Sequence, residues 1–129
     1  MLKKTITYVD YEGVKRTEDF YFNLTKAELI EMEYGVDGGM KKLLEKIINE
    51  NNSKQLMNHF KQIITKSYGE KSLDGKRFIK NQEVLDAFVQ TEAYSELFME
   101  LATNAQAAKD FVNGVLPKVE NPENPSSAN

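Results

Sequence analysis

The sequence predicts an α+β fold that is mostly α-helical, with an N-terminal β-hairpin followed by five or six short helices. Two patterns carry this prediction. Residues 3–24 alternate β-branched or aromatic side chains with others around a glycine-containing turn. From residue 25 onward, apolar residues recur at three- and four-residue spacing in blocks that begin with capping residues. We expect a single domain over residues 1–117, with the hairpin in 1–24 and the helical part in 25–117.

The hairpin is the first predicted element. Ile6 and Tyr8 alternate with neighbouring threonines in one strand, and Phe20 and Phe22 follow the same period in the other. Gly13, in the connecting turn, can adopt a positive φ without steric cost. Two strands alone are marginally stable in water. The apolar face of these four side chains is therefore expected to dock on the helices.

Two helices are predicted between residues 25 and 50. Thr25 and Glu28 have the spacing of a capping box, in which each side chain accepts from the other residue's backbone N–H. We expect this helix to end near Gly35. Asp37 is predicted to cap a second helix. The apolar stripe of that second helix comprises Met40, Leu43, Leu44, Ile47 and Ile48.

A third helix is predicted after a polar break, with Ser53 as its N-cap. Its apolar face comprises Leu56, Phe60, Ile63, Ile64 and Tyr68. Gly69 fits the left-handed position that commonly follows a helix. Residues 70–80 are then expected to form a polar connection with a turn at Asp74 and Gly75.

The last part of the chain predicts two or three further helical segments. Asn81 can cap the first, Thr91 either interrupts it or begins the next, and Asn104 can cap the last. Their apolar positions are Leu85, Phe88, Val89, Tyr94, Leu97, Phe98, Leu101, Ala102, Ala108, Phe111, Val112 and Val115. Pro117 stops the last helix. Residues 118–129 carry almost no apolar side chain, so we expect a disordered tail there.

The composition argues for a non-enzymatic binding module without a metal or cofactor. The 129 residues include no cysteine, no tryptophan and one histidine, His59. Thiolate chemistry and disulfides are therefore excluded, and no carboxylate lies within one turn of His59 to orient it as a base. A net charge of −3 is too mild to favour nucleic acid or an anionic membrane. The chain also lacks an apolar run of about 18 residues that would span a bilayer.

Two patterns carry a chemical interpretation beside a structural one. Glu92, Glu96 and Glu100 share a helical face and could bind a cation or act as acid and base. No Glu-x-x-His pattern supplies further ligands, so a solvated acidic face is favoured. The string GVDGG at residues 35–39 precedes a helix as a phosphate loop does, but it lacks Gly-Lys-Ser/Thr and a preceding strand. Entry into a helix is the favoured interpretation.

Residues 66–80 hold five basic and two acidic side chains, a local net charge of +3, with Tyr68 and Phe78 between them. A solvated loop is the favoured interpretation. The alternatives are a small anion or nucleic-acid site and an electrostatic contact with a partner protein or a neighbouring copy. Lys76 and Arg77 are the candidate contact residues in this loop.

The apolar stripe of the C-terminal helices is expected to be mostly core. Some of it, near Leu116 and Val119, is expected to stay exposed as a docking site for a helix. The candidate partner-binding residues are Tyr94, Phe98, Phe111, Leu116, Lys76 and Arg77.

Several strings resemble small phage proteins encoded in tail gene clusters. They are KKTITY at 3–8, FYFNLTKAE at 20–28, YGEKS at 68–72, DGKRF at 74–78, TEAY at 91–94 and LFMEL at 97–101. Over about residues 1–117 the chain resembles the tail assembly chaperones of long-tailed, siphovirus-like phages of Gram-positive bacteria. These strings are structural rather than chemical, so the resemblance transfers no catalytic residue.

The resemblance implies a function in tail assembly. Such chaperones bind the long, helical, hydrophobic tape measure protein, keep it soluble, and yield to tail tube subunits as the tube polymerises. They work in the cytoplasm of the infected or lysogenic host and are absent from the finished virion. In many members a ribosomal frameshift yields a longer product, whose added domain contacts the tail tube protein. A homo-oligomer is also possible. A minor tail or head–tail connector protein remains an alternative, and a nucleic-acid-binding regulator using residues 66–80 is a weaker one.

Overall fold

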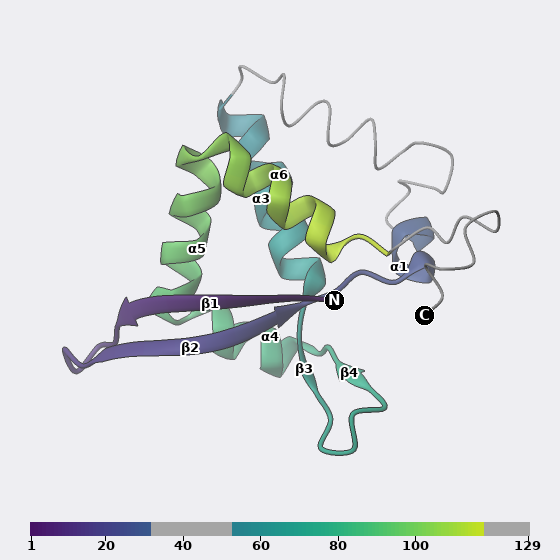
Figure 1. Cartoon of the computed structure of the whole chain (residues 1–129), viewed down its shortest axis with the longest axis horizontal. Coiled ribbons are helices and arrows are strands. Elements are labelled where there is room, and N and C mark those ends of the chain that lie inside the picture. Colours follow the sequence, from purple (N-terminus) through teal and green to yellow (C-terminus); the bar gives the residue numbers. More distant parts are fainter. Residues whose placement is uncertain (32–52, 118–129) are drawn as a thin grey trace, which may run out of the picture.

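A four-stranded sheet and five helices form the part of the chain that the computed structural model describes, residues 1–31 and 53–117. Figure 1 shows their arrangement, with α5 and α6 on one side of the long hairpin and β3 and β4 on the other. The elements are β1 (Leu2–Val9), β2 (Lys15–Phe22), α1 (Lys26–Glu31), α3 (Ser53–Ser67), β3 (Tyr68–Lys71), β4 (Phe78–Ile79), α4 (Gln82–Val89), α5 (Glu92–Thr103) and α6 (Ala105–Val115). The predicted α+β, mostly helical fold with an N-terminal hairpin is confirmed.

The hairpin pairs β1 with β2 over their whole length, from Leu2 opposite Phe22 to Val9 opposite Lys15. Its turn is organised by Asp10, whose Oδ1 accepts the backbone N–H groups of Glu12 and Val14, both at 2.9 Å. Gly13 has a φ of +81°, which confirms the predicted left-handed turn position. The turn is therefore specified by residues that lie next to one another in the chain.

The predicted docking of the hairpin on the helices is confirmed. Ile6, Tyr8 and Phe22 are buried, and Phe20 is partly buried against the same core. Phe22 is 0% exposed, and its ring lies 5.6 Å from that of Tyr68, 5.8 Å from that of Phe88 and 5.1 Å from that of Phe111. Aromatic rings from two strands and two helices thus meet in one core.

The predicted helix caps at Thr25, Asn81, Thr91 and Asn104 are confirmed by their hydrogen bonds, whereas the predicted cap residue Ser53 is the first residue of α3. Thr25 Oγ1 accepts the N–H of Glu28 at 3.1 Å, and Glu28 Oε1 accepts the N–H of Thr25 at 2.9 Å, which completes a capping box. The side chains of Asn81, Thr91 and Asn104 each accept the backbone N–H three residues further on. Thr91 therefore begins α5 rather than interrupting a longer helix.

The prediction for residues 68–80 is wrong in two respects. Tyr68 is the first residue of β3 rather than the end of a helix, and Gly69 is a strand residue without a positive φ. The predicted polar connection also contains β4, which pairs with the second half of β3. The turn prediction holds, since Gly75 has a φ of +75°.

Close packing, rather than backbone conformation, explains the glycine at position 69. A Cβ at Gly69 would lie 2.8 Å from the carbonyl oxygen of Ile79 and 2.7 Å from the ring of Phe78. Strands of four and two residues are too short to show a periodicity in the sequence. Only pairing makes them strands: β3 pairs with β2, which is far away in the sequence, and β4 pairs with β3.

Some sequence predictions lie outside the described residues. They are the end of the first helix near Gly35, the cap at Asp37 and the helix after it, the string at 35–39, and the tail at 118–129 with Val119. Within α3, the predicted inward positions Phe60, Ile63 and Ile64 are buried.

Candidate functional site

The six candidate partner-binding residues come from three places in the fold. Tyr94 and Phe98 lie one turn apart on α5 and are both half-buried. The ring of Tyr94 meets that of Phe88 edge-on at 5.7 Å and lies 6.0 Å from that of Phe98. Burial raises the pKa of the Tyr94 hydroxyl. This pair is anchored in the core on one side and reaches the surface on the other.

The two α6 candidates have different surroundings. Phe111 is 3% exposed, and its ring packs edge-on against Phe22 inside the core. Its ring is therefore not available at the surface of the folded chain. Leu116 is half-buried just beyond the end of α6, where its N–H donates to the carbonyl of Val112 at 3.2 Å.

Leu116 lines a groove between the N-terminus, the segment after β2 and the end of α6. We call it the terminal groove; its volume is about 400 Å³ and its lining is Met1, Leu2, Asn23, Leu24, Thr25, Asn113, Gly114, Leu116 and Pro117. The N–H of Leu24 donates to the carbonyl of Val115 at 3.0 Å, which ties the segment after β2 to the end of α6. Met1 is 57% exposed at the rim. Figure 1 shows the N-terminus beside the end of α6.

The sequence pointed to Leu116 but not to the other walls of the terminal groove. Met1 and Leu2 belong to the first strand region, and Leu24 immediately follows the second strand. Their apolar side chains gave no signal for a shared site, because more than 90 positions separate them from Leu116. A long-range contact of this kind is visible only in the folded chain.

Lys76 and Arg77 lie in the exposed turn between β3 and β4. Asp74 Oδ1 accepts from Ser72 Oγ at 2.6 Å and from the N–H of Lys76 at 3.0 Å, and these contacts shape the turn. They also lower the pKa of Asp74, the hydrogen bond from Ser72 most. Both cationic side chains are thus presented on an exposed turn that also carries Leu73, a fully exposed side chain.

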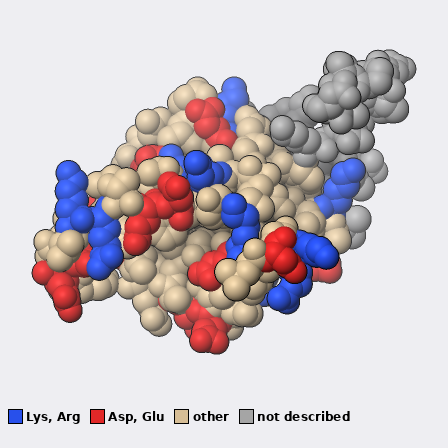
Figure 2. Space-filling model, turned by 60° about the horizontal axis from the view of Figure 1, so that its bottom comes forward, with Lys and Arg blue, Asp and Glu red and all other residues tan. Residues whose placement is uncertain are grey.

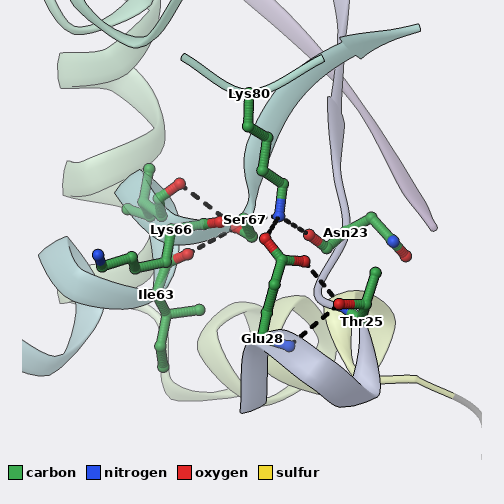
Figure 3. A network of polar contacts seen from close by, with 8 residues as sticks. Asn23, Thr25, Glu28, Ile63, Lys66, Ser67 and Lys80 are labelled. Carbon is green, nitrogen blue, oxygen red and sulfur yellow. Dashed lines mark hydrogen bonds and ion pairs between the residues drawn. The ribbon is translucent and has the colours of Figure 1, made fainter. Parts of the chain in front are cut away.

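The basic segment at residues 66–80 is less free than its composition suggests. Lys80 Nζ donates to the carbonyl of Asn23 at 2.6 Å, to Glu28 Oε2 at 2.6 Å and to the carbonyl of Lys66 at 2.9 Å. Figure 3 shows this ammonium between the end of β2, α1 and the end of α3. Lys71 Nζ lies 4.2 Å from the ring centroid of Tyr21. At least two of the five basic side chains, Lys71 and Lys80, therefore make contacts within the folded chain.

Figure 2 shows how the charged side chains are distributed on one face of the molecule. On the face that it shows, basic and acidic side chains are interspersed, and no large patch of one sign forms. A broad single-sign surface is what sequence-independent binding to nucleic acid requires. The electrostatics of this face fit contacts with another protein better.

The acidic residues of α5 are arranged as a surface face. Glu100 forms an ion pair with Lys4 on β1, and Glu96 is exposed. Within residues 1–31 and 53–117, no group of three or more His, Cys, Asp or Glu side chains is placed to hold a metal ion. His59 is half-exposed on α3. In the described part of the chain, no helix combines the length and apolar character needed to cross a bilayer.

A helix-covered sheet with half-exposed aromatic side chains, and a groove lined by both apolar and polar side chains, are features typical of modules that bind other proteins. The family model described as phage tail assembly chaperone matches residues 1–121. Since this match spans most of the 129 residues, the chain belongs to the phage tail assembly chaperone family. Its partners are accordingly proteins of the phage tail. No curated protein and no solved structure matches the chain.

Proposed function

We propose that this chaperone binds the tape measure protein of its phage, keeps it soluble, and gives way to tail tube subunits during assembly. It does so without catalysis, in the cytoplasm of the infected or lysogenic host, and it is absent from the mature virion. The observation that carries the proposal is the terminal groove, an open apolar site in a member of the tail assembly chaperone family.

The terminal groove suits the apolar side chains of an amphipathic helix. Leu2, Leu24, Leu116 and Pro117 provide an apolar lining, and Asn23 and Asn113 provide polar groups at the same site. A helix presents apolar side chains at i, i+3 and i+4, so one or two of them can enter a groove of about 400 Å³. Such a contact is small, and one copy of the chaperone therefore binds weakly.

Weak binding by each copy is compatible with holding the tape measure protein in solution and then releasing it. Many copies along one long helical protein bind with avidity, while each can still leave as tube subunits arrive. Tyr94 and Phe98 provide a second apolar contact, and Lys76 and Arg77 provide charges that orient the encounter. We propose these four as auxiliary partner-binding residues, with Leu116 as the central one.

Co-expression with the tape measure protein of the same phage tests the proposal. The soluble fraction of the tape measure protein is expected to rise with the wild-type chain and to fall again with Leu116→Asp. Leu73→Asp is the matched control, because it places the same charge on a leucine that is fully exposed in the β3–β4 turn. Circular dichroism of both variants checks that the fold is retained.

The outcomes separate the candidate functions. If the tape measure protein stays equally insoluble with the wild-type chain, the proposal fails. A stoichiometric amount of the chain in purified virions would instead support the minor tail or connector alternative. Salt-dependent binding to DNA or RNA would support the regulator alternative. Equal loss of solubilisation with Leu116→Asp and Leu73→Asp would remove the terminal groove from the proposal.

A further inference from the structure

The outer half of β2 forms an open edge of the sheet. β2 pairs with β1 along all eight residues, but it pairs with β3 only at Tyr21 and Phe22. Among the described residues, none pairs with positions 15–19 on the side away from β1. Figure 1 shows this half of the hairpin extending away from β3 and β4. All five side chains from Lys15 to Asp19 are exposed.

The backbone groups on this open edge can be assigned from the hairpin turn. The N–H of Asp10 donates to the carbonyl of Val14 at 2.9 Å, so these two residues form a hydrogen-bonded pair. In an antiparallel ladder, hydrogen-bonded and non-hydrogen-bonded pairs alternate. Lys15, Thr17 and Asp19 therefore direct their N–H and C=O groups away from β1. Unpaired groups of this kind are a template for another strand.

The charges along this edge are complementary to those of a second, antiparallel copy of the same strand. Residues 15–19 read Lys-Arg-Thr-Glu-Asp. When two such strands lie antiparallel about Thr17, Lys15 faces Asp19 of the other copy and Arg16 faces Glu18 of the other copy. Each pair occurs twice because of the two-fold axis. Opposite charges directly across an antiparallel pair are favourable, and like charges are unfavourable.

We propose that two copies of this chain dimerise by pairing their β2 edges antiparallel about Thr17, so that the sheets of the two copies become continuous. The hydrogen-bond pattern and the charge pattern specify the same register. In that register, Lys15, Thr17 and Asp19 fall in hydrogen-bonded pairs with Asp19, Thr17 and Lys15 of the second copy. These are the residues whose backbone groups face outward.

Other ways of pairing the two β2 strands lose the match of hydrogen-bonding groups, the match of opposite charges, or both. Parallel pairing in register places Lys15 beside Lys15 and Asp19 beside Asp19. A slip by one residue turns the wrong backbone groups toward the partner strand and reverses the side-chain faces. A slip by two residues restores the backbone pattern but separates the opposite charges. Charged edges usually prevent association, whereas this one favours a single antiparallel partner.

Apolar contacts at the two ends of the pairing fit the same register. Val14, which is 51% exposed, lies opposite the half-buried Phe20 of the second copy. Side chains that are exposed in the single chain thereby gain an apolar neighbour.

The charges on the edge keep their present contacts in the dimer. Asp19 Oδ1 accepts from Thr5 Oγ1 at 2.6 Å, Arg16 Nε donates to Asp10 Oδ2 at 2.6 Å, and Glu18 accepts from the Tyr8 hydroxyl. A carboxylate offers several acceptor positions, and a guanidinium offers five N–H donors. The second copy therefore adds contacts to these groups without replacing those they have.

A charge exchange between two single variants tests the dimer. Sedimentation equilibrium of the wild-type chain is expected to show a concentration-dependent dimer. Lys15→Glu and Asp19→Lys each turn two opposite-charge pairs into two like-charge pairs, and each is expected to weaken dimerisation by about 10-fold or more. An equimolar mixture of the two variants recreates opposite charges in the heterodimer, and dimerisation is expected to return.

Two further variants make the test specific. Lys76→Glu applies the same charge change in the β3–β4 turn, and the wild-type dimer constant is expected to persist. Thr17→Pro removes an N–H that faces outward, so the pairing with β1 remains and the dimer is lost. A wild-type chain that stays monomeric up to about 1 mM, or a dimer that neither Lys15→Glu nor Thr17→Pro weakens, overturns the proposal. So does a mixture that fails to recover while both variants are folded.

Dimerisation is independent of whether the chain binds a tape measure protein, because β2 residues 15–19 do not line the terminal groove. A variant that is monomeric but still solubilises the tape measure protein would separate the two proposals.

Discussion

Replacing Lys80 by methionine would remove the cation that joins the end of β2, α1 and the end of α3. Its ammonium makes three contacts of 2.6–2.9 Å, with the carbonyls of Asn23 and Lys66 and with Glu28 (Figure 3). Methionine retains most of the apolar stem, so the change isolates the charge and its hydrogen bonds. We expect the free energy of unfolding to fall without a change of fold.

The magnitude follows from the contacts and their exposure. An intramolecular hydrogen bond contributes about 1 kcal/mol net, and more when one partner is charged, so three contacts give about 3–4 kcal/mol. The side chains of Lys80 and Glu28 are 22% and 30% exposed to solvent, so in the variant water can hydrogen-bond to part of the groups that Lys80 contacts. We therefore expect a loss of about 2 kcal/mol at pH 7 in urea unfolding followed by circular dichroism.

The pH dependence tests the ion pair itself. Partial burial alone would raise the pKa of Glu28, but the hydrogen bond and charge of Lys80 and the N–H of Thr25 outweigh it and lower the pKa. A carboxylate with a lowered folded-state pKa stabilises above its unfolded pKa and loses that contribution as the pH falls through the folded value. The gap between wild type and Lys80→Met should therefore narrow below about pH 4.

Two comparisons make the Lys80 prediction refutable. Lys76→Met, in the exposed turn, is expected to change stability by less than about 0.5 kcal/mol. In a Glu28→Gln background, Lys80→Met is expected to cost less than in the wild type, as a double-mutant cycle measures. The reasoning is refuted if Lys80→Met is as stable as Lys76→Met, or if its cost is the same with and without the Glu28 carboxylate.

The remaining predictions concern the core and the short strands. Phe22→Ala is expected to lower the free energy of unfolding by about 3–5 kcal/mol, because this fully buried ring contacts three others; a loss below about 1 kcal/mol would contradict that. Gly69→Ala should cost about 1–3 kcal/mol, since its Cβ would lie 2.8 Å from a backbone carbonyl. Gly114→Ala should cost less in the same unfolding assay, because its Cβ meets only the movable side chain of Leu2. Burial first, and then the charge and hydroxyl contact of Glu70, raise the pKa of Tyr68 to about 12. Absorbance at 295 nm should therefore show one tyrosine ionising near pH 12 that Tyr68→Phe removes, and the stability due to Tyr68 should be lost as the pH rises from about 10 to about 12.

The hairpin and the helix starts could be read from the sequence because their causes are local. Gly13 reaches its positive φ within a turn whose hydrogen bonds come from Asp10, a few residues away. Thr25, Asn81 and Asn104 cap helices by accepting an N–H three residues further on. Such contacts need only the right residue type at a fixed spacing. The mostly helical α+β class follows from these same signals.

The candidate site was only partly predictable. Leu116, Tyr94 and Phe98 are half-buried, as docking residues can be, but Phe111 on the same apolar stripe lies in the core. A helical periodicity identifies the side that faces inward without telling how deeply each side chain is covered. The depth depends on which strand or helix packs against it, here the ring of Phe22.

By itself, the sequence determined the N-terminal hairpin, the helix starts at Thr25, Asn81, Thr91 and Asn104, the family resemblance and the charge pattern of residues 15–19. Three features are visible only in the tertiary structure. Gly69 is a strand residue packed closely against β4, Lys80 joins three elements through its hydrogen bonds, and β2 has an open edge. The reason is sequence separation: Lys80 contacts Asn23 and Glu28 across 57 and 52 positions. No local pattern encodes contacts of that length, because they exist only once the sheet and helices have packed together.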